Sequence, residues 1–192
     1  DGIFIRGGAI VVSGAQLDAM QTGDASGGGV NVHGGALTVD RGAVIVAGGS
    51  GNGTPGTVDI AADTLEVTGD VHEDTAIVAQ GSAPAYAPMK IVAGAMRVQG
   101  TASIATTYEG AGHGADLSIS ADQLNVDGEG RFALSHILTM KTGAETGTSG
   151  DVQVNAGVMA IVDGGAVKTI QDGAGASGAL HLTTGDLRLH GL

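Results

Sequence analysis

Residues 56–69 read Gly-Thr-Val-Asp-Ile-Ala-Ala-Asp-Thr-Leu-Glu-Val-Thr-Gly. In this stretch Val58 and Ile60 flank a polar residue, and Leu65 and Val67 do the same after a short interval. Alternation with a period of two is typical of a β-strand that has one buried and one solvated face. The stretch therefore predicts two short strands joined by a tight turn, with these four aliphatic side chains facing a core.

The same four apolar positions, spaced two, five and two residues apart, recur along the whole chain. Each position is aliphatic or methionine in seven copies: Ile3/Ile5/Ile10/Val12, Val30/Val32/Leu37/Val39, Val58/Ile60/Leu65/Val67, Met89/Ile91/Met96/Val98, Leu117/Ile119/Leu124/Val126, Val152/Val154/Met159/Ile161 and Leu180/Leu182/Leu187/Leu189. Successive copies start 27, 28, 31, 28, 35 and 28 residues apart, which is typical of a solenoid. The sequence predicts an all-β solenoid of six to seven turns of roughly 28 residues, in which residues 1–192 form a single segment.

Glycine or aspartate precedes the second apolar pair of every copy. Two residues before that pair the chain carries Gly8, Gly35, Asp63, Gly94, Asp122, Gly157 and Gly185. These residue types tolerate the left-handed backbone conformation, so we expect the same sharp corner once per turn.

A third and weaker apolar stretch follows in six of the turns. Its members are Ala15/Leu17/Ala19, Ala43/Ile45/Ala47, Ala76/Val78, Ala102/Ile104/Thr106, Phe132/Leu134 and Val167/Thr169. Three strands per turn predict a triangular coil, and loops rich in glycine lead to the next turn. The two longest turns carry insertions after the second strand, where a solenoid commonly builds a binding surface.

The composition agrees with a narrow coil and excludes several classes of function. The chain is 42% hydrophobic but only 2% aromatic, and it contains 36 glycines, as expected for a thin core of aliphatic side chains with many turns. A net charge of −12 with only eight Lys and Arg argues against binding to nucleic acid, because phosphate recognition needs clustered basic residues. No apolar run is long enough to insert into a membrane, and the absence of cysteine excludes disulfides.

The repeat also resembles a known family. The Gly-rich loop followed by residues 56–69, with echoes at residues 114–128 and 150–165, is similar to the filamentous-haemagglutinin-like repeats of bacterial two-partner-secreted exoproteins. The resemblance covers essentially the whole chain. It implies a right-handed parallel β-helix, export through a dedicated outer-membrane transporter, and an adhesive or biofilm-forming role at the cell surface. Autotransporter passengers share this architecture and are an alternative export route.

Few residues suggest chemistry. His113 lies between two glycines, as in a tripeptide of pectin-cleaving β-helix enzymes, but it stands without the paired aspartates that glycoside hydrolysis requires. Tyr86 and Tyr108 fall in return loops, where an aromatic ring could stack on a sugar. His72-Glu73-Asp74 is interpreted as a solvated turn, and the remaining histidines show no metal-ligand spacing. We therefore predict no catalytic residue, no metal and no cofactor, with Tyr86, Tyr108 and His113 as candidate binding residues.

These observations lead to a functional hypothesis. We expect a non-enzymatic, secreted, surface-exposed adhesin or stalk segment that attaches to cells, surfaces or biofilm matrix, with cell-surface glycans or proteins as partners. The alternatives are a carbohydrate-active β-helix and a structural subunit of an extracellular filament. Because the repeat already runs at Ile3 and still runs at Leu189, we also expect this segment to be either a piece of a longer coil or a unit that stacks head to tail on β-helical neighbours.

Overall fold

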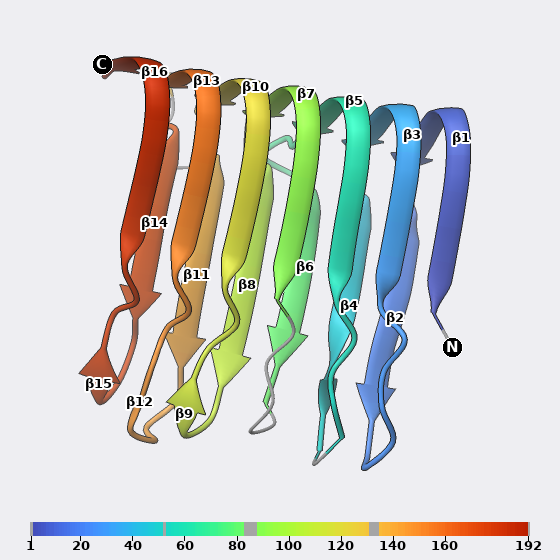
Figure 1. Cartoon of the computed structure of the whole chain (residues 1–192), viewed down its shortest axis with the longest axis vertical. Coiled ribbons are helices and arrows are strands. Elements are labelled where there is room, and N and C mark those ends of the chain that lie inside the picture. Colours follow the sequence, from blue (N-terminus) through green and yellow to red (C-terminus); the bar gives the residue numbers. More distant parts are fainter. Residues whose placement is uncertain (1, 52, 83–87, 131–134, 192) are drawn as a thin grey trace.

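Parallel β-strands form all of the regular structure that is described. The computed structural model describes residues 2–51, 53–82, 88–130 and 135–191 (Figure 1). A seven-stranded sheet contains one long strand from each turn, namely β1 (Ile3–Ser13), β3 (Val30–Asp40), β5 (Val58–Thr68), β7 (Met89–Gln99), β10 (Leu117–Asp127), β13 (Val152–Val162) and β16 (Leu180–His190). Within the described chain there is no helix with the length and apolar character needed to cross a membrane.

Two further sheets complete the coil. Six strands form the second sheet: β2 (Gln16–Thr22), β4 (Val44–Ser50), β6 (Ala76–Gly81), β8 (Ser103–Glu109), β11 (His136–Thr142) and β14 (Ala166–Gln171). A small third sheet contains β9 (Gly112–His113), β12 (Gly147–Thr148) and β15 (Gly175–Ala176). The strands of successive turns pair in parallel, which makes the molecule a β-solenoid as the periodicity predicts.

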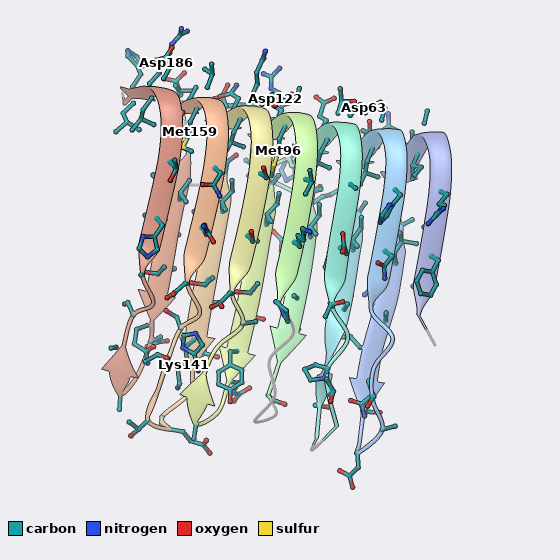
Figure 2. All side chains as sticks on the ribbon, viewed as in Figure 1. Asp63, Met96, Asp122, Lys141, Met159 and Asp186 are labelled. Atoms are coloured by element: carbon teal, nitrogen blue, oxygen red, sulfur yellow. The ribbon has the colours of Figure 1, made fainter. Side chains whose placement is uncertain are left out.

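The two strands predicted in each copy form one continuous, bent strand. In β5 the exposed pair Asp63 and Thr64 lies between Ala62 and Leu65, so the chain turns a corner without leaving the sheet. The labelled Asp63 and Asp122 lie at this bend (Figure 2). The predicted left-handed conformation at the corner is wrong, because none of the seven corner residues has a positive φ.

Close stacking of the backbone explains the corner glycines Gly35, Gly94 and Gly157 better than backbone handedness does. A Cβ atom built on Gly94 would lie 2.7 Å from the carbonyl oxygen of Asp63 in the preceding turn, which is too close for a side chain. The left-handed residues lie beyond the end of the long strand instead, for example Arg41 (φ 54°) and Gly42 (φ 72°). Consecutive positive φ values are the signature of a tight type I′ turn, so the sharp reversal comes after the corner.

The four predicted apolar columns of the long strand form the core. In the column of Ile60, Ile91 and Ile119 each side chain is fully buried between its equivalents in the neighbouring turns. Fully burying an aliphatic side chain of this size stabilises the fold by about 1.5–3 kcal/mol. The coil is therefore held by a continuous apolar interior together with the backbone ladders.

The second sheet confirms most of the third apolar stretch and corrects one turn. Ile45 and Ile104 are buried, as predicted. In β6 the inward residues are Ile77 and Ala79, and the prediction of Ala76 and Val78 is wrong by one position. The chain between β5 and β6 contains a turn closed by a bridge from Asp70 to Glu73, and this longer connection hid the position at which the inward alternation resumes. The predicted pair Phe132/Leu134 lies outside the described residues.

Candidate functional site

Parallel register arranges the outward side chains in rows that run along the coil. Each residue lies beside its equivalent in the next turn, so one row reads Val11, Thr38, Glu66, Arg97, Asn125, Ala160 and Arg188. Glu66 and Arg97 are adjacent in this register, although the turn that separates them is three residues longer than the preceding turn. Neighbouring turns are about 4.8 Å apart, so from Thr38 to Asn125 the row presents one polar side chain per turn at regular intervals.

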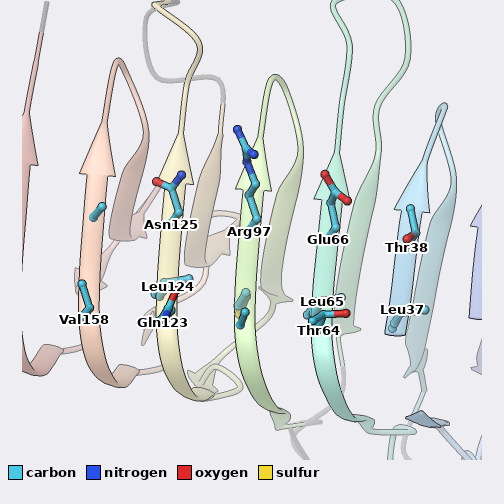
Figure 3. Close-up of a pocket in the computed structure, with 13 residues that line it drawn as sticks. Leu37, Thr38, Thr64, Leu65, Glu66, Arg97, Gln123, Leu124, Asn125 and Val158 are labelled. Atoms are coloured by element: carbon cyan, nitrogen blue, oxygen red, sulfur yellow. The ribbon is translucent and has the colours of Figure 1, made fainter. Parts of the chain in front are cut away.

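A shallow groove follows this row across β3, β5, β7, β10 and β13 (Figure 3). We call it the outer groove, and its volume is about 510 Å³. One wall is formed by Thr38, Glu66, Arg97, Asn125 and Ala160, and the other by Thr64, Ala95, Gln123 and Val158. The buried side chains of Leu37, Leu65, Met96 and Leu124 lie beneath it. The groove thus combines an apolar floor with walls that are mostly polar.

Charge in the outer groove is balanced and exposed to solvent. Arg97 forms an ion pair with Asp127 of the next turn, with 4.0 Å between Nη2 and Oδ2, and Arg97 keeps 52% of its side chain exposed. An exposed pair of this kind contributes about 0.2–1 kcal/mol. Arg97 is therefore available to bind an external acceptor, while Gln123 and Asn125 of β10 offer both donors and acceptors.

Of the two predicted tyrosines, the structure describes Tyr108. Tyr86 lies outside the described residues. Tyr108 lies at the end of β8 with only 3% of its surface exposed, and its hydroxyl donates a hydrogen bond to the carbonyl oxygen of Ala111 at 2.6 Å. Burial, and secondarily the negative charge of Glu145, raise the pKa of the Tyr108 phenol above its ordinary value of 10.0. The Tyr108 side chain therefore packs beneath its loop, and its ring is not exposed to a ligand.

The interpretation of His113 as an isolated residue is wrong. Its Nε2 atom lies 3.2 Å from Oδ1 of Asp116, and its Nδ1 atom lies 2.7 Å from Oγ1 of Thr148 in the following turn. Asp151 stacks directly after Asp116 and completes a group of three potential ligands. The sequence could have indicated this contact, because Asp116 and Asp151 are 35 residues apart and the turn from Leu117 to Val152 has the same length.

A buried polar column lies beneath the return loops; the repeat predicts Thr106 as one of its inward residues, whereas Thr139 and Lys141 were missed in the sequence. Lys141 is fully buried, and its Nζ atom donates to the carbonyl oxygen of Glu145 at 2.8 Å. One inward position earlier, Thr106 and Thr139 are buried and donate to loop carbonyl oxygens of Ala115 and Gly150. The alternation that places Ile137 inside also places Thr139 and Lys141 inside. The period of two therefore indicated these inward positions, but a search for apolar residues passed over them because they are polar.

The comparisons with known proteins give no relative. Neither the protein-family models, nor the curated proteins, nor the solved structures contain a match to this chain. The resemblance to filamentous-haemagglutinin-like repeats therefore stays a prediction that depends on the repeat pattern.

Proposed function

We propose that this chain is a non-enzymatic segment of a secreted bacterial surface protein that mediates attachment to cells, surfaces or biofilm matrix. In this proposal the coil is a stiff stalk and the outer groove is a contact surface for a glycan chain or an extended peptide. The resemblance to two-partner-secreted exoproteins supplies the expected location outside the cell and the outer-membrane transporter as an export partner.

The character of the outer groove is the observation that carries this proposal. Among the described residues that line it, Glu66 is the one carboxylate, and its neighbour in register is the cation Arg97. Glycoside hydrolysis commonly requires two carboxylates placed on either side of the scissile bond. A row of Thr, Gln, Asn, Glu and Arg side chains is instead suited to hydrogen bonding along a polar polymer.

Adhesion of the labelled chain to cultured cells, to bacterial biofilm and to abiotic surfaces tests the proposal. We expect saturable binding that unlabelled chain competes away. Arg97→Gln should weaken this binding, whereas Lys90→Gln is the matched control because Lys90 lies on the same strand and carries the same charge outside the groove. Absence of saturable binding to every surface would contradict the attachment role, and equal losses for both variants would contradict the groove as its site.

A carbohydrate-active β-helix is the second candidate, and one observation favours it. His113 lies beside Asp116 and close to Asp151, so a histidine and two carboxylates meet at one rim of the coil. Incubation with acidic polysaccharides, followed by measurement of new chain ends, distinguishes the two candidates. Turnover that disappears in His113→Ala would favour the enzyme, whereas the adhesin proposal expects no turnover.

A further inference from the structure

His113, Asp116 and Asp151 bring nitrogen and oxygen donors from two successive turns together. One potential ligand atom from each residue lies within 4.8 Å of the other two. His113 and Asp116 belong to the turn that begins with β7, and Asp151 belongs to the turn that begins with β10. About half of the Asp116 side chain and 43% of the His113 side chain are exposed, so an ion can reach the group from solvent.

Parallel register forces the two carboxylates into adjacent positions. Leu117 pairs with Val152, so the aspartates that precede them are stacked about one strand spacing apart. Each carboxylate is held by backbone, because Oδ1 of Asp116 accepts from the amide of Asp151 at 2.9 Å and Oδ1 of Asp151 accepts from Ala179 at 2.7 Å. A carboxylate has a second oxygen that can ligate a cation, and a cation between the two would relieve their mutual repulsion.

The imidazole of His113 distinguishes this group from an ordinary acidic patch. Its Nδ1 atom is hydrogen-bonded to Oγ1 of Thr148, while its Nε2 atom points to Asp116. A hydrogen bond on one ring nitrogen orients the other toward a metal, as is common for histidine ligands in proteins. Thr148 lies on β12, so the neighbouring turn fixes the direction of the ring.

We propose that His113, Asp116 and Asp151 bind a zinc ion that links the fourth and fifth turns of the coil. One imidazole nitrogen with two carboxylate oxygens suits zinc, which takes three protein ligands and a water molecule. Calcium and magnesium prefer oxygen ligands alone. In a tetrahedral site the ligand atoms lie about 3.4 Å apart given metal distances near 2.1 Å, so binding draws these exposed side chains slightly together. Because the ion holds two turns, it should raise the resistance of the coil to unfolding.

Titration of the tag-free chain with zinc chloride, followed by calorimetry, tests this assignment. We expect one equivalent of zinc to bind and the melting temperature to rise. His113→Ala and Asp151→Asn should abolish the binding, and Asp151→Asn keeps the oxygen that accepts from the amide of Ala179, which favours retention of the fold. Thr148→Val should weaken zinc binding about 10- to 100-fold, because it removes the group that orients the ring.

His190→Ala is the matched control for the histidine. His190 also lies near a carboxylate, with 3.4 Å between its Nδ1 atom and Oδ1 of Asp163, but it is outside the three-ligand group that the described residues form. Far-ultraviolet circular dichroism of each variant verifies that the β-structure persists. Zinc binding that persists in both His113→Ala and Asp151→Asn, or is lost equally in His190→Ala, would overturn the proposal. Absence of zinc binding by the folded chain, or calcium binding of equal strength that persists in His113→Ala, would also overturn it.

Discussion

Replacement of one core isoleucine measures how much the stacked interior stabilises the coil. Ile91 of β7 is fully buried between Ile60 and Ile119 of the adjacent turns. Ile91→Ala removes three carbon atoms, which costs about 2.4 kcal/mol of transfer free energy at about 0.8 kcal/mol per carbon. The backbone ladders on both sides keep the neighbouring turns apart, so the cavity cannot close easily. We therefore expect a total loss of about 3–5 kcal/mol in the free energy of unfolding.

The adjacent residue supplies the control. Val92 follows Ile91 on the same strand, but its side chain points outward and is 40% exposed. Val92→Ala should change the free energy of unfolding by about 0.5 kcal/mol or less. Urea unfolding followed by circular dichroism measures both variants against the unchanged chain. A loss below about 1 kcal/mol for Ile91→Ala, or equal losses for the two variants, would refute the inward and outward assignment on which this magnitude depends.

Three further predictions concern the turns and loops. Gly100→Val should destabilise the coil, as judged by a lower urea midpoint, because Gly100 has a φ of 72° and a Cβ there would collide with the carbonyl oxygen of Gly69. Thr106→Val should lower the free energy of unfolding by about 1–3 kcal/mol in the same assay, since it leaves the carbonyl oxygen of Ala115 without the hydrogen bond at 2.7 Å. The raised pKa of Tyr108 means that the unfolded chain releases the phenolic proton first, so stability should fall as the pH rises above 10.0, and Tyr108→Phe should show a smaller fall in urea midpoint.

The sequence predicts the repeat and its buried columns because, in a β-strand, the alternation of neighbouring residues already shows which side chains are buried. Alternation of apolar and polar residues identifies the inward side chains of each long strand. The constant spacing of the four apolar positions within each copy then identifies the equivalent residues in the next turn. For this reason the row from Thr38 through Glu66 to Arg97 follows from counting alone. The conformation at the corner was predicted wrongly because glycine at this position reflects close contact with the preceding turn, as at Gly94. The sequence of a single repeat does not show how closely the neighbouring turn approaches it.

The site was harder to predict because it depends on residues that are far apart in the chain. Asp116 and Asp151 meet because their turn is 35 residues long, and the sequence shows this only after the register is known. Lys141 lies on β11 and was missed for a different reason, since a lysine side chain is expected to point to solvent rather than into the coil. In the structure its ammonium group is satisfied by carbonyl oxygens inside the coil, which include that of Glu145.

Parallel register across the turns is the central claim, because it builds both the outer groove and the proposed zinc site. Disulfide formation between introduced cysteines measures this register directly, since the natural chain contains no cysteine. Asp59→Cys with Lys90→Cys places two thiols in paired positions, where the spacing of about 4.8 Å between turns suits the bond. Asp59→Cys with Arg97→Cys is the control, because Arg97 pairs with Glu66 farther along the strand. The account predicts rapid intramolecular oxidation of the first pair alone, seen by electrophoresis without reductant and by peptide mass. Failure of the first pair to oxidise in the folded chain, or equal oxidation of the control pair, would contradict it.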